Sequence, residues 1–241
     1  MFSAKPFAFA AALAGAAFAL TAPGAASAGT VVKSSGPSAA EFPVGKKLKD
    51  TDRITLKDGD SVTVLTAKGT RVISGAGIHV VGARGAANST KFASLTRQKS
   101  ARQLRTGAIR GGDQDVTNPN IWNVDVTQSG KYCLADPGIV RLWRPDKEAV
   151  ATYSITKPSG AAVNIIFDAD DADAPWNTSE MALDEGTEFT IRGPGGVPET
   201  KVTFAIITFD PATADAETLG ETFIENGCMG QLELLSSSLE G

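Results

Sequence analysis

The sequence predicts a mainly β protein, built from a small β-roll or β-sheet domain and an antiparallel β-sandwich with a C-terminal helix. Three observations lead to this prediction. Glycine occurs 25 times and proline 12 times in 241 residues, which is typical of a chain with many turns. Short apolar runs alternate with polar residues and are separated by glycine-containing turns. A composition of 42% hydrophobic and 21% charged residues excludes a coiled coil, a collagen and a wholly disordered chain.

Residues 1–28 have the pattern of a secretory signal peptide. Lys5 precedes an alanine-rich apolar run from Pro6 to Leu20, and Ala26-Ser27-Ala28 places small residues where a signal peptidase cleaves. The alternative is a membrane anchor, but the apolar run is near the lower limit for crossing a bilayer. We therefore expect cleavage after Ala28 and a mature chain in the periplasm or secreted, with no later segment that spans a membrane.

Residues 29–84 are predicted to form the first β domain. After the apolar pair Val31-Val32, alternating runs occur at four places, with Asp-Gly and Lys-Gly turns that are typical of hairpins. These predicted strands are residues 54–56, 62–65, 70–73 and 78–81. Four short strands with tight turns predict a small sheet or roll.

Three motifs in this domain follow one another closely. They are G-x-x-L at Gly45–Leu48, I-x-L-x-x-G-D-x-V-x-V-L from Ile54 to Leu65, and G-T-x-x-x-x-G from Gly69 to Gly75. Residues 42–82, about a fifth of the mature chain, thereby resemble the periplasmic region of FecR-like proteins. The resemblance implies a non-catalytic β domain that senses or contacts a protein. The chain departs from the family in having neither the cytoplasmic anti-sigma segment nor the transmembrane helix, so what carries over is a protein-contacting β domain.

Charge divides the chain into two parts. Residues 29–112 carry 15 basic and 5 acidic residues, whereas residues 113–241 carry 7 basic and 22 acidic residues. We interpret residues 85–118 as a basic linker with at most a weak helix. Its candidate partner-binding residues are Arg97, Lys99, Arg102, Arg105 and Arg110. They could bind an anionic partner, but the simpler interpretation is that the linker contacts the acidic C-terminal domain of its own chain or remains solvated. Export and the scarcity of aromatic residues argue against nucleic acid.

Residues 119–241 are predicted to form the sandwich. Apolar alternation recurs at seven places, separated by turns at residues 136–138, 158–160 and 193–196. The predicted strands are residues 121–126, 132–134, 139–143, 149–155, 162–167, 188–191 and 202–208. A helix then begins near Asp210-Pro211 and ends at Asn226-Gly227, followed by a second helical turn.

The two cysteines, Cys133 and Cys228, are expected to form a disulfide. An exported chain meets an oxidising compartment, and the bond would attach the C-terminal helix to the sandwich. Two buried free thiols are the alternative. The only histidine, His79, lies in a predicted strand, and one histidine excludes sites that need two.

The remaining candidate residues are acidic or aromatic. Asp168, Asp170, Asp171 and Asp173 cluster in one predicted loop, where they form a weak calcium candidate, although the loop lacks the glycine and glutamate of an EF-hand. Trp122 and Trp143 are interpreted as core residues, whereas Trp176 is the candidate exposed aromatic residue for stacking on a sugar. Nucleophile and phosphate-loop motifs are absent from the sequence, and no cofactor is predicted.

The sequence therefore favours an exported, non-enzymatic protein that acts as an interaction or envelope-sensing accessory. Its expected partner is an unidentified envelope protein, anionic where the basic linker makes the contact. The alternative is a glycan-binding module with weak hydrolase character, built on Trp176 and the loop Asp168–Asp173.

Overall fold

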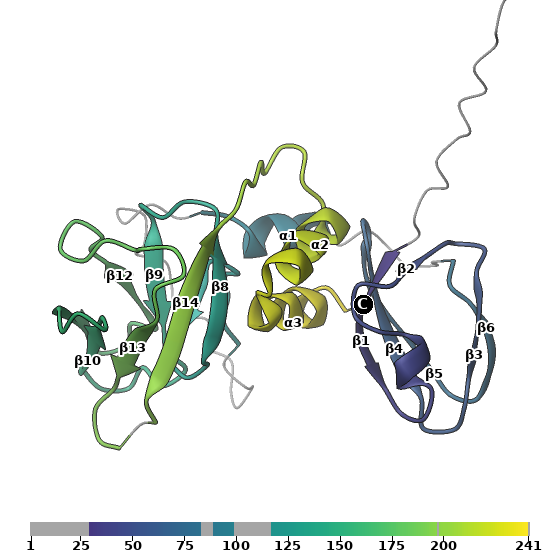
Figure 1. Cartoon of the computed structure of the whole chain (residues 1–241), viewed down its shortest axis with the longest axis horizontal. Coiled ribbons are helices and arrows are strands. Elements are labelled where there is room, and N and C mark those ends of the chain that lie inside the picture. The colour runs from purple at the N-terminus through teal and green to yellow at the C-terminus, as the bar shows by residue number, and fades with distance from the viewer. Residues whose placement is uncertain (1–28, 83–88, 99–116, 197, 241) are drawn as a thin grey trace, which may run out of the picture.

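The computed structural model describes residues 29–82, 89–98, 117–196 and 198–240, which form two β bodies with helices between them (Figure 1). The mainly β prediction is confirmed: the described residues form four sheets and end in helices. The predicted signal peptide lies outside the described residues. Within the part of the chain that is described, no helix has the length and apolar character needed to cross a membrane.

The N-terminal body contains six strands and one short 3-10 helix. They are β1 (Gly29–Ser35), η1 (Ala39–Glu41), β2 (Lys47–Leu48), β3 (Arg53–Leu56), β4 (Ser61–Thr66), β5 (Gly69–Ser74) and β6 (Gly77–Val80). A four-stranded sheet in the order β2-β1-β4-β5 and a two-stranded ribbon of β3 and β6 are both antiparallel. Apolar side chains from the two sheets, among them Val62, Ile54 and Ile73, form one buried core. The four predicted strands are all present.

The turn before β4 is fixed by the carboxylate of Asp60. This side chain is buried and accepts hydrogen bonds from the backbone N–H groups of Ser38, at 2.9 Å, and Lys57. The N–H of Ser38 stabilises the charged form, so the pKa of the Asp60 carboxyl lies below its ordinary value. Gly36 passes so close that a Cβ there would lie 2.5 Å from Asp60 Oδ1. Asp60 thus joins two loops by hydrogen bonds.

The C-terminal body contains eight strands in two facing sheets. The strands are β7 (Asn123–Asp125), β8 (Gly130–Leu134), β9 (Val140–Trp143), β10 (Ala151–Thr156), β11 (Ala162–Phe167), β12 (Asp173–Trp176), β13 (Phe189–Arg192) and β14 (Thr200–Ile206). One sheet has the order β11-β10-β13-β14-β8 and the other β12-β9-β7. Their facing side chains, including Phe167, Phe189 and Phe204, form the largest apolar cluster.

The prediction of an antiparallel sandwich is wrong in two strand pairs. β14 pairs with β8, and β7 pairs with β9, in parallel. Parallel neighbours need a crossover instead of a hairpin. For β7 and β9 the crossover is β8, which lies in the opposite sheet, so alternation along each strand could not reveal the direction of pairing.

The segment predicted as an acidic loop ends in strand β12. Pro175 lies in this strand opposite Arg141 of β9. Proline lacks the N–H that an inner strand would need, but β12 is an edge strand and pairs only with β9.

Three helices lie between the β bodies: α1 (Ser89–Leu95), α2 (Ala216–Asn226) and α3 (Met229–Ser238). The predicted C-terminal helix begins later than expected, because Asp215 caps it by accepting a hydrogen bond from Thr218 N at 2.8 Å. It ends as expected at Gly227, which has a φ of 76°. The predicted second helical turn is the ten-residue helix α3.

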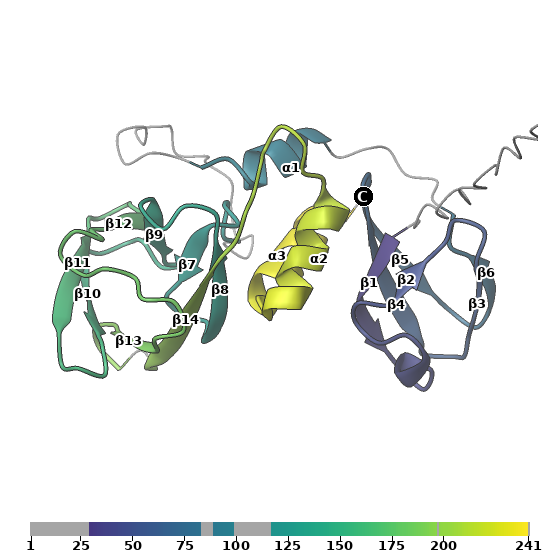
Figure 2. The ribbon, with the colours of Figure 1, turned by 45° about the horizontal axis from the view of Figure 1, so that its top comes forward.

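The helices share one apolar core with both β bodies (Figure 2). Val32 and Leu65 enter this core from the N-terminal sheet, and Cys133 and Ala205 enter it from β8 and β14. Phe223 of α2 is fully buried among them. The two β bodies are therefore joined through a common helical layer.

Opposite charges of the two halves meet at this layer. Lys47 contacts Glu221 of α2 at 3.0 Å, and Lys33 contacts Glu233 of α3 at 3.4 Å. Thr30 Oγ1 also donates to Glu221 at 2.9 Å. The hydrogen bond to Glu221 favours the charged amine, so the pKa of Lys47 is raised. Part of the charge asymmetry of the sequence thus lies across the contact between the N-terminal sheet and the helices.

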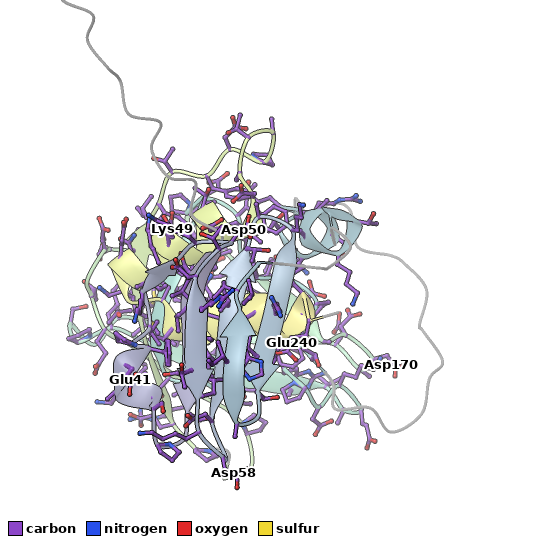
Figure 3. All side chains as sticks on the ribbon, turned by 90° about the vertical axis from the view of Figure 1, so that its right-hand side faces the viewer. Glu41, Lys49, Asp50, Asp58, Asp170 and Glu240 are labelled. Atoms are coloured by element: carbon purple, nitrogen blue, oxygen red, sulfur yellow. A yellow bond between two sulfur atoms is a disulfide. The ribbon has the colours of Figure 1, made fainter. Side chains whose placement is uncertain are left out.

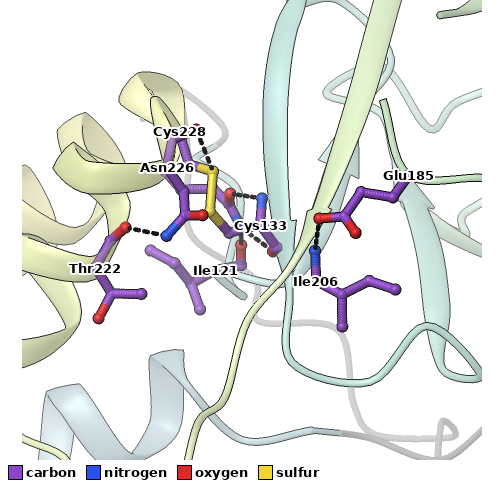
Figure 4. The surroundings of a disulfide bond; sticks show 8 residues. Ile121, Cys133, Glu185, Ile206, Thr222, Asn226 and Cys228 are labelled. Carbon is purple, nitrogen blue, oxygen red and sulfur yellow. Dashed lines mark hydrogen bonds between the residues drawn. A yellow bond between two sulfur atoms is a disulfide. The ribbon is translucent and has the colours of Figure 1, made fainter. Parts of the chain in front are cut away.

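The predicted disulfide between Cys133 and Cys228 is present, with both residues fully buried (Figure 4). It links β8 to the residue before α3. Gln231 of α3 reinforces the link, because its side chain accepts from Cys133 N at 2.6 Å and donates to the backbone oxygens of Cys133 and Ile121. The bond and the amide together fasten the helical layer to the sandwich.

Gly220 allows α2 to lie close to β4. A Cβ at this position would lie 2.4 Å from Leu65 Cδ2, in a side chain that is fully buried. We expect Gly220→Ala to lower the free energy of unfolding by about 1–3 kcal/mol, because the helix must move away from the sheet. Urea denaturation measures the change.

The matched control is Gly230→Ala in α3, where the nearest atom to a new Cβ would be Gln128 Oε1 at 3.5 Å. This change should raise the free energy of unfolding by up to about 1 kcal/mol through helix propensity. Equal effects at the two glycines would contradict close packing at Gly220.

Replacing both cysteines with alanine should lower the free energy of unfolding by about 3–5 kcal/mol, because the bond closes a long loop whose ends are 95 residues apart. Urea denaturation of the double variant and of the wild type measures this difference. Alkylation of two thiols in the unreduced wild type, detected by mass spectrometry, would show that the bond does not form.

Candidate functional site

Large apolar side chains are exposed near each other at the end of the N-terminal body. On β6, Ile78 is 69% exposed and Val80 is 49% exposed. Figure 1 places β3 and β6 at the end of the molecule farthest from the sandwich. We call the outer face of the β3–β6 ribbon, defined by Arg53, Thr55, Ile78 and Val80, the ribbon face.

Strand alternation explains why these residues point outward. Ile78 pairs with Thr55 and Val80 pairs with Arg53, and all four are exposed. The residues between them point to the opposite side, where Ile54 is buried and His79 is half-buried. The inward positions thus close the core of the N-terminal body, and the outward apolar positions are left to solvent.

Arg71 of β5 holds the ribbon in place. Its Nη1 atom donates to three successive backbone oxygens, those of Val80, Val81 and Gly82, at 3.1, 2.6 and 2.9 Å. The turn between β5 and β6 depends on Gly75 and Gly77, whose φ angles are 90° and 135°. The ribbon face is therefore presented by a fixed backbone.

Charged residues lie at both ends of the ribbon. Figure 3 faces this end of the molecule and shows Lys49 and Asp50 at one end of the strands and Asp58 at the other. Lys49 and Asp50 precede β3, and Asp58 follows it. An apolar centre with charged residues around it is the usual composition of a protein-binding patch.

His79 has a structural role. Its Nε2 atom lies 2.9 Å from the backbone oxygen of Gly75, across the turn that connects β5 and β6. The interpretation of His79 as a partly exposed strand residue is confirmed by its half-buried position in β6.

Only one of the predicted basic partner-binding residues is described. Arg97 is exposed, and its backbone oxygen accepts a hydrogen bond from Asn120 Nδ2 at 2.7 Å. Lys99, Arg102, Arg105 and Arg110 lie outside the described residues, so a basic binding surface stays a prediction. The preceding part of the predicted linker is anchored, because Trp122 Nε1 donates to Thr96 O at 2.7 Å.

The prediction that Trp176 is exposed is wrong. Trp176 is 3% exposed and packs edge-on against Phe189 and Phe204, with ring centroids 5.3 and 5.8 Å away. Its Nε1 atom donates to Met181 O at 3.1 Å. Because β12 is a strand, its side chains point alternately to the core and to solvent, and Trp176 occupies a core-facing position. It offers no face to a sugar. Trp122 and Trp143 are also buried, as predicted.

The acidic loop before β12 is organised around the guanidinium of Arg144. This buried side chain donates to Asp168 O at 2.9 Å and to Asp171 O at 3.1 Å, and it lies over the ring of Phe167. Asp173 forms an ion pair with Arg141. Asp170 adopts a left-handed backbone conformation, with a φ of 68°.

The loop therefore does not support the calcium candidate. Within the described ranges, no three histidine, cysteine, aspartate or glutamate residues are gathered closely enough to hold a metal ion. The backbone oxygens of Asp168 and Asp171 in this loop accept hydrogen bonds from Arg144.

The sequence did not indicate a cavity of about 210 Å³ between α3 and strands β7 to β9. Its lining includes Asn118, Asn123, Asp125, Tyr132 and Gln231, which are buried polar residues. Most of their polar atoms are bonded within the chain: Tyr132 OH donates to Gln128 O at 3.1 Å, and Asn123 Nδ2 donates to Asn118 Oδ1 at 3.3 Å. Burial raises the pKa of the Tyr132 hydroxyl far above its ordinary value. The cavity is lined by a satisfied hydrogen-bond network.

Comparison with known proteins gives no family for this chain: no protein-family model matches it, and no curated protein matches it. The ribbon face is the feature of the described residues that calls most directly for a binding partner.

Arg144→Met should lower the free energy of unfolding by about 2–3 kcal/mol, because it leaves the backbone oxygens of the acidic loop without their buried donor. Thermal or urea unfolding measures this effect. Lys147→Met is the matched control, since it removes the same charge from an exposed side chain nearby.

Calcium should not change the melting temperature of the wild type. A rise on adding calcium, abolished by Asp168→Asn, would contradict the assignment of Arg144 as the cation of this loop.

Proposed function

We propose that the protein is an exported, non-enzymatic interaction protein of the cell envelope, which contacts another protein through the N-terminal β body. The observation that carries the proposal is the ribbon face, where Ile78 and Val80 are exposed side by side on one strand. Neighbouring exposed apolar residues with a charged rim are typical of a surface that a partner covers.

The placement of the ribbon face supports this proposal. The opposite side of the N-terminal body is occupied, because its sheet packs on α2 and α3 through Val32 and Leu65. The ribbon is at the other end, away from the helical layer and the sandwich (Figure 2). A partner can therefore reach it without disturbing the contact between the two bodies.

The resemblance of residues 42–82 to FecR-like periplasmic domains supports the same function. In that family this part is a non-catalytic β domain that contacts a protein. The buried disulfide is compatible with a location outside the cytoplasm, where such a bond persists. Glycan binding has no comparable support, because Trp176 lies in the core.

The test is in-cell cross-linking of the tagged full chain, followed by mass spectrometry of the envelope fraction. We expect one dominant cross-linked protein. In the double variant Ile78→Asp/Val80→Asp its yield should fall at least about tenfold, because binding would bury two carboxylates without partners. Both side chains point to solvent, so the melting temperature should not fall.

The matched control is Ile166→Asp, which changes a residue that is 60% exposed on the edge strand β11 of the sandwich. It should leave the cross-linked protein unchanged. Recovery of glycan in place of a protein, or equal loss in the control and the double variant, would overturn the proposal.

A further inference from the structure

Strand β5 is the terminal strand of its sheet, and the C-terminus of the chain begins to pair with its outer edge. Thr70 N donates to Leu239 O at 3.2 Å, and Thr70 and Glu240 form a parallel bridge. Figure 1 shows the C-terminus beside the N-terminal sheet. This edge thus already forms a backbone hydrogen bond with a distant part of the sequence.

The rest of the edge is open. In an antiparallel ladder, the backbone groups of alternate residues point away from the partner strand. Since Thr70 N points away from β4 to Leu239, the N–H and C=O groups of Val72 and Ser74 point outward as well. Over the described ranges, β5 has β4 as its only ladder partner, and no backbone bond from another segment reaches Val72.

We propose that the outer edge of β5 accepts an extended segment of the protein partner as an added strand, in line with the C-terminal residues. The proposal rests on the function proposed above and adds the mode of recognition. Strand addition gives backbone hydrogen bonds at Val72 and Ser74, and the side chains around them provide selectivity.

The residues around the edge indicate the chemistry of the segment. Val72 is 46% exposed and can pack beside one β-branched or other apolar side chain. Lys68 is exposed near the Thr70 end of the edge, and residues 29–82 carry eight basic and five acidic residues. The added strand is therefore an apolar segment that also carries carboxylates.

Two other end strands have features that hinder the addition of a strand. β2 has only two residues, and β12 contains Pro175. β5 contains no proline, and its outward positions Val72 and Ser74 carry no charge. The end strand β11 also has an exposed apolar residue, Ile166, but no other segment pairs with its outer edge within the described residues, so it serves as the control.

The first part of the test is amide hydrogen exchange by NMR on the chain from residue 29. In the free protein, the amides of Val72 and Ser74 should exchange at least about tenfold faster than that of Ile73, which bonds to β4. Equal protection of the three amides would mean that the edge is closed and would overturn the proposal.

The second part adds a defined probe, the peptide acetyl-Glu-Thr-Val-Glu-Val-Thr-amide, at millimolar concentration. We expect about tenfold slower exchange at Val72 and Ser74 and no change on β11. Val72→Pro, which removes an outward N–H, should abolish this protection, whereas Val72→Thr should keep it. Protection on β11 instead, protection nowhere, or self-association through β5 in place of peptide binding would each overturn strand addition.

These outcomes are separate from those of the proposed function. If the cross-linked partner is lost in Ile78→Asp/Val80→Asp but unaffected by Val72→Pro, the partner contacts the ribbon face alone and strand addition fails. Far-UV circular dichroism and the melting temperature show whether Val72→Pro remains folded. Val72→Asp, which keeps the backbone N–H but repels the carboxylates of the added strand, gives a second disruption of the same edge.

Discussion

The packing of α2 and α3 between the two β bodies is the constraint on which the rest of the structure depends. The helices fill one apolar core that takes Leu65 from the N-terminal sheet and Ala205 from the sandwich. The disulfide and the side chain of Gln231 fix α3 to β8, and Gly220 lets α2 approach β4. The relative position of the two β bodies thus depends on side chains of α2 and α3, which are far in sequence from the N-terminal sheet that they contact.

This constraint decides which surfaces remain available. One face of the N-terminal sheet is covered by the helices, and its cross-body ion pairs use Lys33 and Lys47. Exposed ion pairs contribute little stability, so the apolar core sets the position and the charges favour the correct contact. The opposite end of the N-terminal body, with Ile78 and Val80, is left free.

The strands could be predicted because alternation and turn residues are local signals. The disulfide could be predicted because the chain has two cysteines and a secretory pattern. The parallel pairing of β8 with β14 could not be predicted, because the pairing partner of a strand depends on the path of the whole chain. Trp176 was misplaced because a neighbouring run of aspartates resembles a loop, and only the pairing of β12 with β9 determines which way its side chains point.

The acidic loop around Arg144 also shows that a local sequence pattern does not determine the contacts of a candidate site. A run of aspartates predicts carboxylate ligands, but the loop uses backbone oxygens, and their partner is an arginine more than twenty residues earlier. By contrast, the ribbon face needed only the strand pattern and the knowledge of which side is buried. His79 lies on the inner side because it pairs with the buried residue Ile54, so Ile78 and Val80 face outward.

The exposed apolar residues of β6 differ from those on the sandwich. On the outer face of β10 and β11, Ile166 lies opposite Thr152, and the next outward pair is Ser154 and Asn164, so its paired neighbours are polar. Another exposed apolar residue, Val150, directly precedes β10. Single exposed apolar residues are common and need no partner. Ile78 and Val80 instead occupy consecutive outward positions of one strand. The protein contact proposed above would cover both of these side chains.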